Sequence, residues 1–231
     1  MSTEPVEIEM FADVSCPWCH GALETSRRLL DELAADPAIP TLALQWRFMR
    51  LHPMPAGSPL TLDEYYSTWA PDDDEVGARA RDDVRSYVRG VGVWVDFTRY
   101  THLRDPFVAH RLLAIVRDDD GDDLPSLWSL ARAVFNANFV RGVDITDHAA
   151  LRGGVERGGL VLPVRIWEQV ADPDVYRVET LADHERALQV QLDGVPRMVI
   201  DGTIVPTWID PDEVRRQLRA AIDSAASSAR A

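Results

Sequence analysis

The chain has 231 residues, with 24 basic and 38 acidic side chains and a formal net charge of −14. This length can bury a sizeable core, and a hydrophobic content of 46% excludes a disordered chain. The acidity argues against nucleic-acid binding, because that affinity needs positive side chains that face phosphates. Every basic residue is arginine, and the absence of lysine excludes Schiff-base lysines, lysine-bound pyridoxal phosphate and Walker-type phosphate loops.

The N-terminal segment MSTEPVEIEMF carries acidic residues before its apolar stretch and does not resemble a secretory signal. No window of the sequence reaches the roughly 20 apolar residues of a membrane-spanning helix. We therefore expect a cytoplasmic protein with no membrane partner. In a reducing cytosol, the two cysteines are expected to be catalytic or metal-binding, and not a structural disulfide.

The first fifty residues predict a strand, a helix and a second strand. Residues 6–13 alternate between apolar and polar side chains, which is typical of a strand. Ser15 or Cys16 opens a helix with Pro17 in its first turn, where a missing N–H costs nothing. Residues 41–49 alternate again and predict the second strand.

The middle of the chain predicts a block of helices. Three prolines and a glycine at 53–59 indicate a linker. Helix start signals follow at 105–106, 124–126 and 144–147. Alternating charge at 75–89 is typical of the solvated face of a helix.

Strand-forming residues return near the C-terminus. Residues 195–200 and 203–207 predict two strands joined by a hairpin turn at Asp201-Gly202. Asp210 and Pro211 then provide the N-cap and first position of a final helix. The order β-α-β, helical block, β-β-α predicts an α/β domain interrupted by a helical insertion.

The cysteines form the motif Cys16-Pro17-Trp18-Cys19, followed by His20, at the junction of the first strand and helix. Unpaired N–H groups and the positive end of the helix dipole favour thiolate over thiol at this place. Cys16 is nearer the helix start and is expected to be the more accessible nucleophile. Cys19, one turn further on, is expected to attack the mixed disulfide and release the product. A C-x-x-C motif inside a β-α-β pattern therefore predicts dithiol–disulfide exchange.

Three other interpretations of the motif stay open at this point. CPWCH matches the C-x-x-C-H string of haem c attachment, although that attachment normally takes place outside the cytoplasm. A zinc site would need four ligands, and only Cys16, Cys19 and His20 cluster in the sequence. The third interpretation is two buried cysteines at a chance spacing. We favour disulfide exchange, with no metal site.

Five segments together resemble the DsbA-like branch of the thioredoxin superfamily, and within it the cytoplasmic FrnE-like group. They occur in the family's order over nearly the whole chain: CPWC at 16–19, WRFMRLHPMP after the second predicted strand, AHRLLA at 109–114, LARAVFNANFVRGVDITD at 130–147 and GVPRMVIDG from Gly194. The resemblance implies a thioredoxin fold interrupted by an all-helical insertion. The thioredoxin-like domain would comprise residues 1–55 and 178–231, and the helical insertion domain residues 56–177.

The resemblance also implies an activity: exchange of disulfides with protein or small-molecule thiols, without a bound cofactor. It implies that Pro196 is a cis-proline facing the disulfide, which would leave polar groups of Val195 free to pair with a substrate peptide. The same branch contains 2-hydroxychromene-2-carboxylate isomerases and kappa-class glutathione transferases. A glutathione-dependent isomerase or transferase is therefore the alternative, with glutathione as co-substrate. Those isomerases typically carry serine at the first cysteine position, so the intact pair disfavours isomerisation. A homodimer is compatible with the resemblance.

Further residues are candidates for positioning the substrate. Trp18, beside Pro17, is expected to be exposed and to offer an apolar contact. His20 either stabilises the thiolate when protonated or is a helix-face residue partly buried by the insertion. Arg197 departs from the small or apolar residue usual in the family. It either stabilises the thiolate or pairs with an acidic substrate group, or it faces solvent on an edge strand. His110 is expected to be a packed helical residue.

Overall fold

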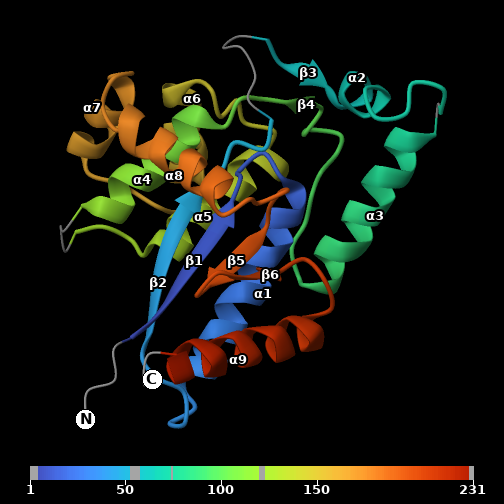
Figure 1. Cartoon of the computed structure of the whole chain (residues 1–231). Helices are drawn as coiled ribbons and strands as arrows, with labels where there is room; N and C mark the ends of the chain where they lie inside the picture. The colour runs from blue at the N-terminus through green and yellow to red at the C-terminus, as the bar shows by residue number, and fades with distance from the viewer. Residues whose placement is uncertain (1–4, 53–57, 74, 120–122, 229–231) are drawn as a thin grey trace.

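The computed structural model describes residues 5–52, 58–73, 75–119 and 123–228, and Figure 1 shows its arrangement. The predicted order of a β-α-β unit, a helical block and a β-β-α unit is confirmed. The elements in chain order are β1 (Val6–Ala12), α1 (Pro17–Ala34), β2 (Leu42–Phe48), β3 (Leu60–Thr61), α2 (Leu62–Ser67), α3 (Val76–Gly90), β4 (His102–Leu103), α4 (Phe107–Asp118), α5 (Leu127–Phe139), α6 (His148–Arg157), α7 (Val164–Ala171), α8 (Arg177–Gln189), β5 (Arg197–Ile200), β6 (Thr203–Pro206) and α9 (Pro211–Ser228).

The main sheet has four strands in the order β2-β1-β5-β6. β1 runs parallel to β2 and antiparallel to β5, and β6 returns antiparallel to β5 through the hairpin turn. The turn residues Asp201 and Gly202 have φ of 46° and 76°, as the predicted Asp-Gly turn requires. Because β6 covers the outer side of β5, Arg197 lies on an inner strand, and the interpretation of Arg197 as an edge-strand residue is wrong.

Helices cover both faces of this sheet. In Figure 1, α8 passes in front of the strands and α1 lies behind them. α9 contacts α1, β1, β5 and β6, whereas α4 and α8 pack against β2. α3 stands beside α1 and also contacts α2, which lies against the two-stranded β3–β4 ribbon.

The local signals in the sequence explain where several helices begin. Pro17 takes the first position of α1, after the extended N-cap residue Cys16. Ser126 and Asp147 cap α5 and α6 by accepting hydrogen bonds from backbone N–H groups at the third helical position. Asp210 accepts from the Glu213 amide at 3.1 Å and caps α9 in the same way. Of the predicted linker at 53–59, residues 53–57 lie outside the described residues.

The buried side chains of the sheet and of the helical block form one continuous cluster. Phe11 of β1 belongs to it together with Leu112 of α4 and Phe135 of α5. The two parts of the chain therefore share a core, and burial of either part stabilises the other. The domain boundaries given above stay a prediction. Within the described ranges, no helix is long and apolar enough to cross a membrane.

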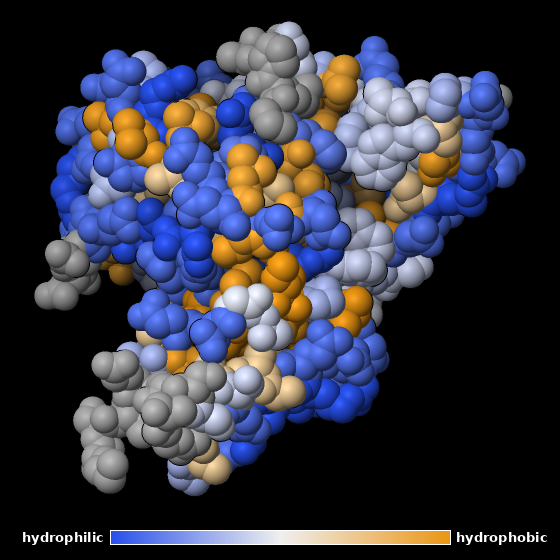
Figure 2. Space-filling model, in the orientation of Figure 1, coloured by the Kyte–Doolittle hydropathy of each residue, from blue (hydrophilic) through white to orange (hydrophobic). Residues whose placement is uncertain are grey.

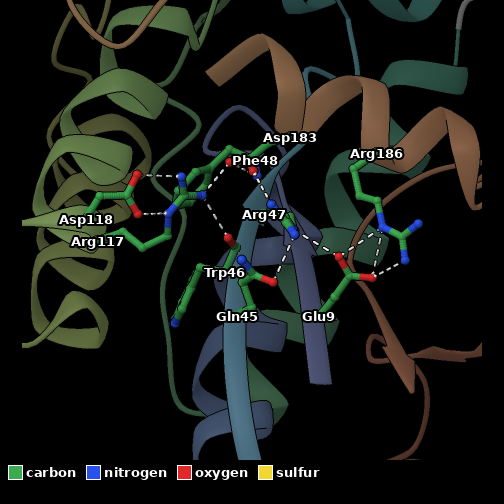
Figure 3. A network of polar contacts seen from close by, with 9 residues as sticks. All are labelled: Glu9, Gln45, Trp46, Arg47, Phe48, Arg117, Asp118, Asp183 and Arg186. Carbon is green, nitrogen blue, oxygen red and sulfur yellow. Dashed lines mark hydrogen bonds and ion pairs between the residues drawn. The ribbon is translucent and has the colours of Figure 1, made fainter. Parts of the chain in front are cut away.

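A polar network ties α8 and α4 to the sheet, and Figure 3 shows its members. Asp183 of α8 is 1% exposed and accepts from Arg47 of β2 at 3.1 Å and from Arg117 of α4 at 2.6 Å. The Arg47 guanidinium also donates to Glu9 of β1 at 3.0 Å, and Glu9 in turn accepts from Arg186 at 2.7 Å. The Asp183 carboxylate is thus the point at which three elements meet.

We expect Asp183→Ala to lower the free energy of unfolding by about 3 kcal/mol, because it leaves two partly buried guanidinium groups without their shared carboxylate. Urea unfolding followed by tryptophan fluorescence measures this loss. Asp118→Ala is the matched control, since it removes the other, more exposed carboxylate on Arg117 and should cost less than about 1 kcal/mol. Equal losses in the two variants would contradict a central role for Asp183.

Candidate active site

The two cysteines lie at the junction between β1 and the start of α1. A turn closed by the hydrogen bond from Cys16 N–H to the Asp13 carbonyl at 3.1 Å connects the two elements. Both thiols are free, and both are buried, with Cys16 5% and Cys19 2% exposed. Cys16 is therefore more accessible than Cys19 only by a small margin, and its sulfur is reached through a cavity and not from an open surface.

The Val195–Pro196 segment lies against the first cysteine. Phe11 of β1 pairs with Arg197 of β5, so the residues before Arg197 continue past the end of β1 toward Cys16. The Val195–Pro196 peptide bond is cis, in agreement with what the resemblance implied. The Cys16 thiol donates to the Val195 carbonyl, with 3.8 Å between sulfur and oxygen. Two segments 179 residues apart in the chain thus meet at this sulfur.

A cavity of about 260 Å³ opens beside Cys16. Its walls come from the start of α1, the segment after β2, and the helical block around α2, α3 and β4; they are Ser15, Cys16, Pro17, Trp18, Leu51, His52, Leu62, Tyr65, Tyr66, Trp69, Ala80, Asp83, Val84, Tyr100 and Leu103. Figure 2 shows apolar and weakly polar surface around a recess at the upper right, where α2 and α3 meet the rest of the molecule. Cys16 lines this cavity and Cys19 does not.

Trp18 is half-buried, so the expectation that it is exposed is wrong. Its ring packs against Tyr87 of α3 at 5.0 Å and against Trp208 at 5.8 Å between centroids. Gly21 makes this approach of α3 possible, because a Cβ at that position would lie 2.4 Å from a ring carbon of Tyr87. Trp18 still lines the cavity together with Pro17, so both remain in reach of a substrate at Cys16.

His20 is a core residue and does not face the sulfurs as a cation. It is 1% exposed, and its ring packs against both Phe135 and Phe139 of α5, each 5.6 Å away between centroids. Burial lowers the pKa of His20 to about 4, so the ring is neutral near pH 7. The interpretation of His20 as a thiolate-stabilising cation is therefore wrong, and its burial by the helical block is confirmed.

Arg197 is held by its own neighbours. Its guanidinium donates to the Pro196 carbonyl at 3.0 Å and to the Asp193 carboxylate at 3.2 Å. Arg197 is not among the residues that line the cavity. The guanidinium next to the cis-proline thus braces the loop that carries Val195.

The loop that precedes Cys16 is held by residues of the helical block. The Val14 amide donates to His110 Nε2 of α4 at 3.2 Å, and the Val14 carbonyl accepts from Asn138 of α5 at 2.9 Å. The Ser15 carbonyl accepts from the Tyr100 hydroxyl at 3.2 Å. His110 is packed in a helix as predicted, but its hydrogen bond to this loop was not predicted from the sequence, because 96 residues separate the two partners.

Asp13 is a second residue that the sequence analysis missed. Its fully buried carboxylate accepts from the Ser15 amide at 2.7 Å and the Leu51 amide at 2.6 Å, and lies 3.3 Å from His110 Nε2. Burial acts to raise the pKa of Asp13, but the contact with His110 and the two amides outweigh it and lower the pKa. The group is thus a buried carboxylate that stays ionised. An acidic residue three positions before the first cysteine was the available signal.

The environment of Cys19 keeps its proton on the sulfur. Burial raises the pKa of the Cys19 thiol well above its usual value, and the nearby Cys16 sulfur and the Asp13 carboxylate act in the same direction. The Asp13 main-chain N–H, 3.5 Å from the Cys19 sulfur, opposes this effect. Chemically, the arrangement offers one sulfur to the cavity and holds the second behind it as a thiol.

The arrangement of the described side chains bears on the metal interpretation of the motif. Throughout the described ranges, no group of three or more His, Cys, Asp or Glu residues is arranged to hold a metal ion. The His20 ring, which the zinc interpretation would need, packs against the Phe135 and Phe139 rings.

The neutral state of His20 predicts that the stability of the folded protein decreases at acidic pH. A histidine whose pKa falls from 6.5 in the unfolded chain to about 4 in the folded one contributes stability above pH 6.5 that is lost as the pH falls toward 4. The loss attributable to His20 amounts to about 3 kcal/mol. We expect His20→Leu to remove this part of the decrease in the free energy of unfolding with falling pH. Urea unfolding at several pH values measures it. An unchanged decrease would contradict the burial of a neutral ring.

The raised pKa of Cys19 predicts a pH-dependent second step in disulfide exchange. When reduced protein reacts with 4,4'-dithiodipyridine, the second release of thiopyridone reports the attack of Cys19 on the mixed disulfide. Its rate should rise about tenfold per pH unit below the Cys19 pKa, because only the thiolate attacks. Asp13→Asn removes a negative charge near Cys19 and should move this profile to lower pH. Asp82→Asn, which removes an exposed carboxylate on α3, should leave the profile in place.

Comparison with known proteins places this geometry in a family. The family model described as "DSBA-like thioredoxin domain" matches residues 7–219. A search of curated proteins finds no match.

Three of the solved structures with the same fold are described as an oxidoreductase, a disulfide isomerase and a disulfide reductase. A probable DsbA oxidoreductase from Streptomyces coelicolor has a TM-score of 0.78 at 23% identity, over 94% of this chain and 89% of that one. A proposed protein disulfide isomerase from Nitrosomonas europaea has a TM-score of 0.71 at 18% identity, over 96% and 99% of the two chains. The cytosolic disulfide reductase DsbM from Pseudomonas aeruginosa, solved with glutathione, has a TM-score of 0.54 at 14% identity, over 93% and 98%.

These likenesses show the fold, which is a thioredoxin fold with a helical insertion. The family itself follows from the sequence match, which spans most of the 231 residues and includes the cysteine pair and the cis-proline. The chain belongs to the family of DsbA-like thioredoxin domains.

Proposed function

We propose that the protein is a thiol–disulfide oxidoreductase in which Cys16 exchanges with a substrate sulfur and Cys19 resolves the mixed disulfide. The observation that carries this proposal is the unequal placement of the two sulfurs. Cys16 lines the cavity at the start of α1, whereas Cys19 lies behind it and keeps its proton. An entering sulfur therefore meets Cys16 first.

The exchange proceeds in two steps. The Cys16 thiolate attacks one sulfur of a substrate disulfide, a Cys16–substrate disulfide forms, and the first substrate thiolate leaves. Cys19 then loses its proton and attacks the Cys16 sulfur, and the second substrate thiolate leaves. The dithiol has given up two electrons, and the substrate disulfide has become two thiols. The reverse sequence oxidises a substrate dithiol.

Residues around the sulfurs have supporting roles in this scheme. The Val195 carbonyl accepts from the Cys16 thiol at 3.8 Å and becomes free for a substrate N–H once that thiol has reacted. Pro196 holds this carbonyl in place, and Pro17 and Trp18 form the cavity wall beside the nucleophile. His20 supports α1 from within the core, and Arg197 braces the loop of Val195.

A glutathione-dependent isomerase or transferase is the alternative that the family permits. The glutathione in the similar disulfide reductase supports glutathione as a co-substrate here, and the word "cytosolic" in its description supports a cytoplasmic place of action. This alternative would be favoured if Cys19→Ser kept the glutathione-dependent activity of the wild type and bound glutathione saturably. Dithiol–disulfide exchange requires both cysteines, so it predicts that Cys19→Ser stalls at the mixed disulfide.

A redox titration tests the proposal. Protein equilibrated in buffers of reduced and oxidised dithiothreitol should pass between the dithiol and a Cys16–Cys19 disulfide with one midpoint. Tryptophan fluorescence can follow the transition, since Trp18 lies between the cysteines, and mass spectrometry confirms the bond. Cys16→Ser is the control and should show no transition. The proposal would be contradicted if no Cys16–Cys19 disulfide formed at any ratio of reduced to oxidised dithiothreitol.

A trapping experiment identifies the exchange partner. In Cys19→Ala the second step is blocked, and we expect a mixed disulfide between Cys16 and its substrate to accumulate in cells. Mass spectrometry of that adduct distinguishes a protein partner from a small thiol. Accumulation of the same adduct in Cys16→Ala would contradict the assignment of Cys16 as the nucleophile.

A further inference from the structure

The cavity beside Cys16 carries a charge pattern that bears on the substrate. Its walls are mostly aromatic and aliphatic, and of the described residues that line it none is an arginine, although the chain contains 24. Asp83 of α3 is the carboxylate on its wall. Within the described residues Asp83 has no hydrogen-bond or ion-pair partner, whereas its neighbour Asp82 is bonded to Arg85 at 2.7 Å.

The other titratable groups of the wall add no positive charge. His52 Nε2 and the Tyr65 hydroxyl lie 2.5 Å apart and are paired with each other. Burial lowers the pKa of His52 and raises those of Tyr65 and Tyr66, so the ring and both phenols are neutral near pH 7. Arg81 of α3 lies over the Tyr66 ring, 5.9 Å from its centroid, but it does not line the cavity and is paired with Asp63 at 2.7 Å. Asp83 is thus the charged side chain on the described wall that has no partner.

The physical consequence is a preference for cations over anions. Asp83 is exposed, so its attraction for a cation in the cavity is moderate and depends on salt. The faces of Tyr and Trp rings attract cations as well. An anionic group placed here would meet Asp83 and the Cys16 thiolate with no arginine to compensate.

Size and access point to a small substrate. The cavity of about 260 Å³ lies just below the range of roughly 300–1,000 Å³ usual for ligand pockets. Cys16 is only 5% exposed, so a reacting sulfur has to enter the cavity to reach it.

We propose that the substrate of Cys16 is a low-molecular-weight disulfide whose short apolar substituents carry protonated amines, and that Asp83 selects it over anionic disulfides such as glutathione disulfide. This inference rests on the proposed function and names its substrate class. The chemistry is the exchange given above: the enzyme dithiol is oxidised to the 16–19 disulfide, and one substrate disulfide is reduced to two aminothiols.

Three disulfides of similar size and different charge test the inference. They are cystamine, bis(2-hydroxyethyl) disulfide and 3,3'-dithiodipropionate, which are cationic, neutral and anionic. The second-order rate constant for oxidation of the reduced protein is measured at low ionic strength by tryptophan fluorescence. Each constant is divided by that for dithiothreitol in the same buffer, which removes the intrinsic reactivity of the disulfide. We expect the normalised constants to fall in the order cationic, neutral, anionic.

Variants of α3 test whether Asp83 causes this dependence of the rate constant on substrate charge. Asp83→Asn should lower the constant for cystamine about threefold and raise that for dithiodipropionate about threefold, with little change for the neutral disulfide, as expected for an exposed charge. Asp82→Asn changes the net charge equally but removes the neighbour that is bonded to Arg85, so it should change none of the three. Molar salt should abolish the Asp83 effect.

The outcomes separate this inference from the proposed function. If no disulfide converts the dithiol to the 16–19 bond, the proposed function fails. If the bond forms but the wild type shows no charge order, or Asp83→Asn and Asp82→Asn behave alike, the assignment of the substrate class is overturned while the function stands. A faster reaction with the disulfides of an unfolded protein than with cystamine, unaffected by Asp83→Asn, would also overturn it.

Discussion

The buried carboxylate of Asp13 is the interaction on which the arrangement of the site depends. Its two amide donors come from the loop before Cys16 and from the segment after β2. His110 of α4, which accepts from the Val14 amide of the same loop, lies beside the carboxylate. A buried carboxylate without such donors would cost several kcal/mol, so the loop and the segment after β2 are held together wherever Asp13 stays ionised. The start of α1, and with it Cys16, therefore has its position set by the helical block as well as by the sheet.

The helical block also forms most of the walls of the cavity that leads to Cys16. A C-x-x-C motif at the start of a helix on an open surface would accept many partners. Here α2, α3 and the β3–β4 ribbon build the walls of the cavity around Cys16, with aromatic rings from α2, and α5 buries His20 behind it. The same insertion thus holds the loop through His110, Asn138 and Tyr100 and narrows access to the sulfur. The support of the loop and the walls of the cavity therefore come from the same part of the chain.

Much of the fold was predictable because its signals are local. The alternation of β1 and β2, Pro17 at the start of α1, the caps at Ser126 and Asp147, and the Asp201-Gly202 turn each act within a few residues. The β3–β4 ribbon was not predicted, because strands of two residues are defined only by their pairing with each other, about forty positions apart. Trp18 was misjudged for a similar reason, since Tyr87 and Trp208, which cover it, are distant in the chain.

The sequence by itself determined the presence of two cysteines, their spacing on one helical turn and the order of the elements around them, because these depend on residue type and on neighbours in the chain. Only the tertiary structure decided that His20 is a neutral core residue, that Arg197 lies on an inner strand, that Asp13 is a buried ionised group and that Asp83 lies on the wall of the cavity. The physical reason is that burial and pairing are properties of residues brought together from distant parts of the chain, and these properties set the charge of each side chain.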